Sequence, residues 1–199
     1  MRTFGYREYH RSGAGYPPPL EILGREAPEC ISLFGNPAAL NQPLIGLLCS
    51  RRVPRGMDER VYEWACAARD LRFAVIGGFL SEAERDCLEV LLQGNQPVVV
   101  CLARGLRATR IPARWRSPIQ RGRLLLLSPF PDTVREVTAA TAELRNRVVA
   151  ALSHRLVVPY ASPGGGLLRL VSRAIRDGVP VHAFDHPENR PLLRVGARF

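Results

Sequence analysis

Short continuous apolar runs alternate with segments of helical spacing from residue 30 onward, and this rhythm constrains the fold most. The apolar runs cover residues 30–35, 44–49, 73–76, 97–103, 124–127, 156–158 and 179–184. Helical periodicity or helix caps lie between them, at 57–68, 81–93, 132–152 and 167–176. Because the runs do not alternate apolar with polar residues, both faces of each strand are expected to be buried. The pattern predicts an α/β fold: a doubly wound, mostly parallel, Rossmann-like sheet with helices on both faces.

Residues 1–29 differ from the rest because they are rich in Gly, Pro and Arg and only weakly patterned. We interpret them as an N-terminal extension, and residues 30–199 as a single Rossmann-like domain. No apolar run approaches the roughly 20 residues of a membrane-spanning helix. The first 16 residues lack the apolar stretch of a secretory signal. We therefore expect a cytoplasmic protein without membrane contact.

All 28 residues in the Lys and Arg count are arginine, and against 18 acidic residues they give a net charge of +10. A GC-rich genome would explain the absence of lysine, and so would a phosphate-rich partner, because the planar guanidinium grips phosphate with two donors. Without lysine there is no Walker-type phosphate loop. No Gly-x-Gly-x-x-Gly follows the first strand, which disfavours dinucleotide binding. We expect no cofactor.

The five cysteines lie at long intervals with no Cys-x-x-Cys pair. They are expected to be reduced core residues rather than zinc ligands. His182 and His186 flank Asp185, but no third ligand accompanies them, so no metal site is predicted. Neither Ser50 nor Ser162 has an evident His–Asp relay, and no catalytic residue is predicted.

Polar or glycine-rich segments follow four of the predicted strands, at 50–52, 77–79, 101–107 and 162–166. Ligands of parallel sheets bind beyond the carboxyl ends of the strands. Glycines let a ligand approach the backbone there, and helix N-termini favour anions. Gly77-Gly78 is also typical of a simple tight turn, whereas the three glycines of 164–166 exceed what a turn requires. These ends predict a phosphate-binding rim.

Two further basic segments are candidates for function. Arg145-Asn146-Arg147 interrupts a helix whose other face is apolar. Residues 104–123 carry seven arginines around Trp115 and are expected to form a loop with little regular structure. Single-stranded nucleic acids bind such surfaces through charges and a stacking ring, although Trp115 could equally anchor the loop to the core. The candidate residues of this secondary basic loop are Arg107, Arg110, Arg114, Trp115 and Arg116.

Several of these segments resemble motifs of the DprA/Smf (DNA-processing protein A) family. The most specific is Arg-Asn-Arg-Val-Val-Ala-Ala-Leu-Ser at 145–153, which is similar to the family's Arg-Asn-Arg-Ile-Ile-Ala-Gly-Leu-Ser. Leu-Phe-Gly-Asn-Pro at 33–37 and the Cys-Ser-Arg ending at 51 resemble its Gly-Asn turn and Gly-Ser-Arg strand end. Residues 156–181 resemble its final strand, Ser-Gly loop, helix and strand. The resemblance covers most of residues 16–184.

The resemblance implies a protein that binds single-stranded DNA through the phosphate backbone in DNA processing, recombination and natural transformation, without catalysis. It implies single-stranded nucleic acid and a recombinase as partners, and a homodimer is compatible with the fold. Together with the strand ends, it implies a phosphate pocket lined by Ser50, Arg51, Arg52, Gly77, Gly78, Arg145, Asn146, Arg147, Ser162, Gly164, Gly165 and Gly166.

Two departures from the family pattern leave alternatives open. Cys49 stands where the family has Gly, and residues 79–84 replace an Ala-Arg-Gly-Ile-Asp-like continuation, which removes an Arg and adds acids. One alternative is a small-nucleotide sensor or a phosphoribohydrolase-like enzyme of the related lysine-decarboxylase-like fold, whose Pro-Gly-Gly-x-Gly-Thr loop residues 163–166 partly echo. Glu82 and Glu84 would then be the carboxylates available for acid–base chemistry. A dimerising scaffold with a degenerate pocket is the third hypothesis.

Overall fold

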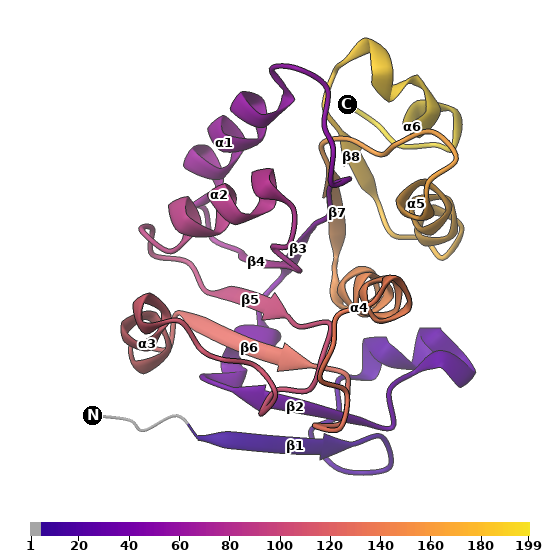
Figure 1. Cartoon of the computed structure of the whole chain (residues 1–199). Helices are drawn as coiled ribbons and strands as arrows, with labels where there is room; N and C mark the ends of the chain where they lie inside the picture. The colour runs from indigo at the N-terminus through magenta and orange to yellow at the C-terminus, as the bar shows by residue number, and fades with distance from the viewer. Residues whose placement is uncertain (1–4) are drawn as a thin grey trace.

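An eight-stranded sheet runs through the centre of the computed structural model, which describes residues 5–199 (Figure 1). The strands are β1 Tyr6–His10, β2 Cys30–Phe34, β3 Leu44–Leu47, β4 Ala74–Gly77, β5 Val98–Cys101, β6 Leu124–Ser128, β7 Arg155–Val158 and β8 Val181–Ala183. Their order is β1-β2-β6-β5-β4-β3-β7-β8. From β6 to β8 in this order all pairs are parallel, whereas β2 runs antiparallel to both of its neighbours, β1 and β6.

Helices cover both faces of this sheet. They are α1 Met57–Ala68, α2 Glu82–Leu91, α3 Ala113–Gln120, α4 Ala139–Leu152, α5 Gly166–Arg176 and α6 Arg190–Arg194, with short 3-10 helices η1 Pro18–Glu26, η2 Pro37–Asn41 and η3 Pro187–Asn189. Residues of α1, α2 and α3 share one buried apolar cluster, and residues of η1, α4, α5 and α6 share the other. The predicted doubly wound, mostly parallel sheet is therefore confirmed. No helix within residues 5–199 has the length and apolar character needed to cross a bilayer.

The segment interpreted as an extension contributes to this sheet. β1 pairs with β2 along its whole length, and Leu20 and Leu23 of η1 are buried against α4. The weak pattern of residues 1–29 did not indicate this strand, because β1 is an edge strand whose residues are half-buried or exposed. Residues 1–4 lie outside the described part of the chain.

One helix prediction and one loop prediction need correction. The capping box of Thr138 and Thr141 starts α4 at Ala139, and not at Asp132 as predicted. The preceding turn is held instead by the Asp132 carboxylate, which accepts a hydrogen bond from the Arg107 backbone N–H at 2.9 Å. Residues 104–123 were expected to be irregular but contain α3, whose Ile119 is buried in the core.

Candidate functional site

The strand order of the sheet reverses between β3 and β7. Strands β4, β5 and β6 are added on one side of β3, and β7 and β8 on the other. The loops after β3 and β7 therefore diverge at this point, where open α/β sheets bind their ligands. The backbone N–H of Ser162 donates to Ser50 Oγ at 2.9 Å, and the N–H of Ser50 donates to the Tyr160 carbonyl at 3.1 Å. The two predicted serines thus lie together where the β3 and β7 loops diverge, and we call this place the crevice.

The glycine pair at the end of β4 makes room for an arginine. A Cβ on Gly78 would lie 0.7 Å from Nη1 of Arg145, so only glycine fits here without moving that side chain. Arg145 comes from the middle of α4 and is only 4% exposed. Gly77-Gly78 is therefore more than a tight turn, because the missing side chain of Gly78 leaves space for a buried guanidinium.

The Arg145 guanidinium lacks the partners that buried charges normally have. Within residues 5–199 its Nε and Nη1 are buried without a hydrogen-bond partner, and Oδ1 of Asn146 is in the same situation. Burial lowers the pKa of Arg145, the Glu84 carboxylate and Cys101 counteract this, and Arg51 lowers the pKa further. A guanidinium still stays protonated at neutral pH. An unpaired buried cation is costly, so this position favours an incoming anion.

A carboxylate already occupies one wall of the crevice. Glu84, 4% exposed, accepts hydrogen bonds from the backbone N–H groups of Cys49 at 2.9 Å, Leu80 at 3.0 Å and Ser81 at 3.1 Å. The capping box of Ser81 and Glu84 was predicted from the sequence and is present. The bond from Glu84 to the β3 loop was not predicted, and it ties β3 to the start of α2.

The residue that follows Gly78, Phe79, has a strained backbone conformation. Its φ of +50° makes it the one non-glycine residue with a positive φ among residues 5–199. Its ring is buried with α1 and α2. Strain of this kind costs on the order of 1 kcal/mol and clusters at functional sites.

The loop after β7 presents backbone groups at the start of α5. Gly164 has a φ of +69° with open space around it, so its backbone angle and not crowding requires glycine. The Gly165 N–H donates to the Ser162 carbonyl at 3.0 Å, and α5 begins at Gly166 with no acidic residue in its first turn. This helix N-terminus suits an anion. Arg51 and Arg52 are exposed in the β3 loop.

Arg147 is not brought to the crevice. Its Nη2 donates to Glu143 at 2.7 Å and its Nη1 pairs with Glu26 of η1, which also accepts from Arg173 at 3.1 Å. These carboxylates raise the pKa of Arg147, Glu143 most. Arg147 therefore joins α4 to η1 on the side of α4 opposite to the one that contacts Gly78.

The secondary basic loop is distributed along α3 and the segment before it. Arg107 pairs with Asp132 at 3.3 Å and lies 4.3 Å above the Tyr6 ring, while Arg114 pairs with Glu89 at 2.8 Å. Trp115 packs against the core cluster of α1, α2 and α3, as the anchoring alternative expects. Arg110 and Arg116 are exposed.

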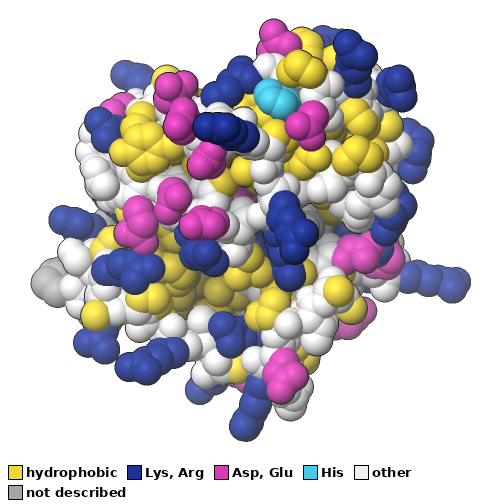
Figure 2. All heavy atoms as spheres, turned by 45° about the horizontal axis from the view of Figure 1, so that its top comes forward, with side chains coloured by type: hydrophobic (Ala, Val, Ile, Leu, Met, Phe, Trp, Pro, Cys, Tyr) yellow, Lys and Arg dark blue, Asp and Glu magenta, His cyan; other side chains and the backbone are white. Residues whose placement is uncertain are grey.

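Figure 2 tilts the top of Figure 1 toward the viewer and shows how charge is spread over that face. Arginines surround a hollow with a hydrophobic floor. Acidic side chains gather at the upper left, where Figure 1 places α1 and α2. A polyanion would therefore favour the arginine-rich rim over the α1–α2 surface.

Comparisons with known proteins bear on the family and on the fold. The model of a family described as DNA recombination-mediator protein A matches residues 9–197, which confirms the resemblance seen in the motifs. A search of curated proteins found no match.

Among solved structures, DNA processing protein A (DprA) from Streptococcus pneumoniae matches with a TM-score of 0.78 and 19% identity over 97% of this chain and 70% of that chain. DNA processing protein A from Helicobacter pylori, studied for its single-stranded DNA binding mode, matches with a TM-score of 0.77 and 19% identity over 100% of this chain and 92% of that chain. The Moco carrier protein from Chlamydomonas reinhardtii has a TM-score of 0.51 and 14% identity over 79% and 87%. At these identities the likeness shows the fold alone.

Proposed function

Because the chain belongs to the DNA recombination-mediator protein A family, we propose that it binds single-stranded DNA through the phosphate backbone and acts in DNA processing and recombination without catalysing a reaction. The observation that carries this proposal is the buried Arg145 guanidinium, whose Nε and Nη1 have no partner within residues 5–199. The Helicobacter pylori relative, which has a single-stranded DNA binding mode, supports the same ligand.

Three elements would share the phosphates. The exposed Arg51 would meet the strand at the mouth of the crevice, the N–H groups at the start of α5 would bind a neighbouring oxygen, and Arg145 would supply positive potential from below. Glu84 closes the remaining wall with its own carboxylate. A phosphate would therefore lie nearer to α5 than to α2, because like charges repel.

The enzymatic alternative has less support. A general acid or base must reach the substrate with a free proton or lone pair. The Glu84 carboxylate accepts three backbone N–H bonds, and Glu82 lies exposed at the first turn of α2. Glu84 is thus already engaged by backbone N–H groups and Glu82 is exposed to solvent, so neither is a ready acid or base for a ligand in the crevice.

The test is binding of the full chain to fluorescently labelled oligo-dT, followed by anisotropy across a salt series. We expect affinity to fall steeply with salt, because each neutralised phosphate releases counterions. Arg51→Ala should weaken binding about tenfold and lower the salt slope by about one. Arg176→Ala, which removes the same charge from the far end of α5, should stay within about twofold.

Three outcomes would overturn the proposal. The first is the absence of salt-sensitive binding at low salt, and the second is equal affinity of Arg51→Ala and the unaltered chain. The third is release of free adenine when the chain is incubated with AMP, which would place the phosphoribohydrolase-like alternative first.

A further inference from the structure

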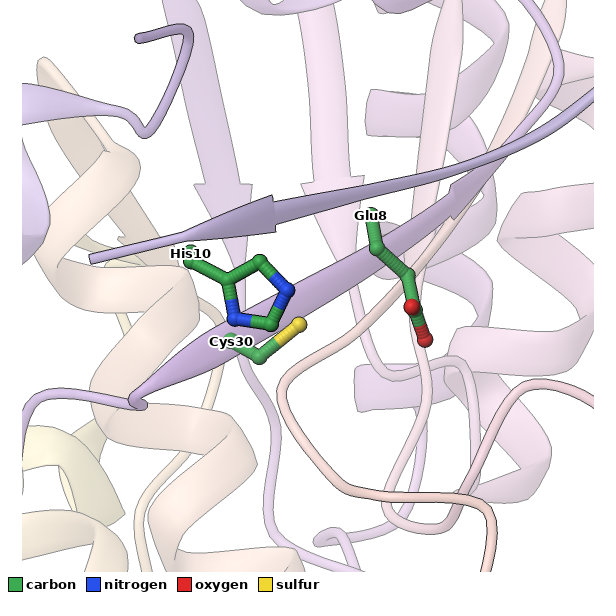
Figure 3. Close-up of side chains that lie close together, drawn as sticks. All are labelled: Glu8, His10 and Cys30. Atoms are coloured by element: carbon green, nitrogen blue, oxygen red, sulfur yellow. The ribbon is translucent and has the colours of Figure 1, made fainter. Parts of the chain in front are cut away.

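The outer edge of the sheet brings together three side chains that metals favour. β1 and β2 pair antiparallel, with His10 opposite Cys30 and Glu8 opposite Ser32. Alternate residues of a strand point to the same face, so Glu8 and His10 of β1 share a face with Cys30 of β2. Figure 3 shows the imidazole beside the thiol, with the carboxylate farther along the same face of this strand pair.

We propose that Glu8, His10 and Cys30 form a binding site for a zinc ion at this edge. One ligand atom from each residue lies within 4.8 Å of the other two. Tetrahedral zinc, with bonds of roughly 2.0–2.3 Å, separates its ligand atoms by about 3.5 Å. Side-chain rotation alone can close that difference, since all three residues are exposed or half-buried.

The chemistry of the ligands selects the class of metal. Thiolate and imidazole are ligands of zinc and similar transition metals, whereas magnesium and calcium take oxygen ligands. Three protein ligands would leave the fourth position of a tetrahedral zinc to water.

The hydrogen bonds around Glu8 orient its carboxylate. Its Oε1 accepts from the Tyr6 hydroxyl and from Ser32 Oγ at 3.4 Å. Tyr6 is itself held by Ser32 at 2.9 Å and by the Arg107 guanidinium over its ring. Such outer contacts fix the direction of a metal ligand.

The charge around the cluster also suits a cation. Within residues 5–199 Glu8 forms no ion pair, although the chain carries 28 arginines, and the neighbouring Arg11 pairs with Glu21 and Glu29 instead. A bound cation would offset the charge of the Glu8 carboxylate and would pin the edge strand β1 to β2.

The spacing along the chain gave no signal for this site, because 19 residues separate His10 from Cys30 and the strand pairing alone unites them. The site is independent of the crevice, since β1 and β2 lie at the opposite edge of the sheet from β7.

The test uses the full chain after chelator treatment, titrated with Co²⁺ and then with Zn²⁺. We expect one Co²⁺ per chain, with a near-ultraviolet thiolate-to-cobalt band that Zn²⁺ abolishes. Cys30→Ser should lose the band. Glu8→Gln and His10→Ala should each weaken Zn²⁺ binding about tenfold or more. Cys66→Ser, which removes another partly exposed thiol on α1, should keep both band and affinity.

A band that survives Cys30→Ser, or unchanged affinity in either Glu8→Gln or His10→Ala, would overturn the proposal. Far-UV circular dichroism of each variant verifies folding, with Cys30→Ala replacing Cys30→Ser if the latter fails to fold. Oligo-dT binding should be equal in all these variants, so failure of the zinc site and failure of the proposed function are separable.

Discussion

Arg145 and Arg147 lie two residues apart in one sequence motif, yet they occupy opposite environments. Arg145 is buried against Gly78 with unpartnered donors, whereas Arg147 pairs with Glu26 and Glu143 at the surface of η1. With 3.6 residues per turn, positions i and i+2 point about 200° apart around a helix. A motif that resembles a known family as one unit thus divides into a residue suited to bind an anion and a residue that fastens two elements together.

Among the variants that test this difference between Arg145 and Arg147, Gly78→Ala should have the largest effect. The new Cβ would collide with the Arg145 guanidinium, and a buried side chain has little room to move. We expect a loss of about 3 kcal/mol in the free energy of unfolding, measured in urea, together with weaker oligo-dT binding. Gly5→Ala is the control, because a Cβ there would meet no atom within 4 Å.

A double-variant cycle isolates the cause of this loss. In an Arg145→Ala background the collision partner is absent, so Gly78→Ala should cost less than about 0.5 kcal/mol. Equal costs in both backgrounds would show that Gly78 is required by the backbone and not by Arg145.

Glu84→Gln should reveal how far the crevice depends on its internal carboxylate. The amide has one oxygen, so at least one of the three N–H groups now bound by Glu84 would lose its acceptor. We expect a loss of about 2 kcal/mol in urea unfolding. Glu82→Gln, on the same turn but exposed, should change stability by less than about 0.5 kcal/mol. Similar losses in both variants would contradict the bridging role.

Arg145→Met should separate binding from stability. Methionine keeps much of the length and removes the charge, so oligo-dT affinity should fall about tenfold. Stability in urea should hold or rise, because an unpartnered buried cation disappears. A clear loss of stability would mean that the surrounding protein groups already stabilise the guanidinium, so that it does not need an anion as a partner.

The sequence predicted the central strands of the sheet better than its edges. Runs such as 98–101 and 124–127 are apolar throughout because both faces of the sheet are covered, and that pattern is local. The meeting of Ser50 with Ser162 follows from parallel strands that end at one edge. β1 escaped prediction because it is an edge strand whose residues are half-buried or exposed, and because its sequence is dominated by polar residues.

The partner of Arg147 could not be predicted for a different reason. Glu26 lies 121 residues away in a segment without clear periodicity, and only the packing of η1 on α4 brings the two together. The start of α4 was placed too early because Asp132 lies in a turn that it holds through the backbone of Arg107, 25 residues away. Long-range hydrogen bonds of this kind leave no mark in local spacing.

Arg147→Ala should give the smallest effect and complete the contrast with Arg145. The ion pair with Glu26 is partly exposed, so we expect a loss of under about 1 kcal/mol near pH 7, with oligo-dT affinity unchanged within about twofold. The hydrogen bond from Arg147 holds the pKa of the Glu26 carboxyl below its ordinary value of 4.5. A carboxyl whose pKa is lowered by folding contributes stability above its unfolded pKa and loses it as the pH falls through the folded pKa. The difference between the unaltered chain and Arg147→Ala should therefore be constant at neutral pH and shrink as the pH falls below about 4.5. Urea unfolding of both proteins across that range measures it, and a difference that persists undiminished in acid would assign the loss to packing of the arginine stem and not to its charge.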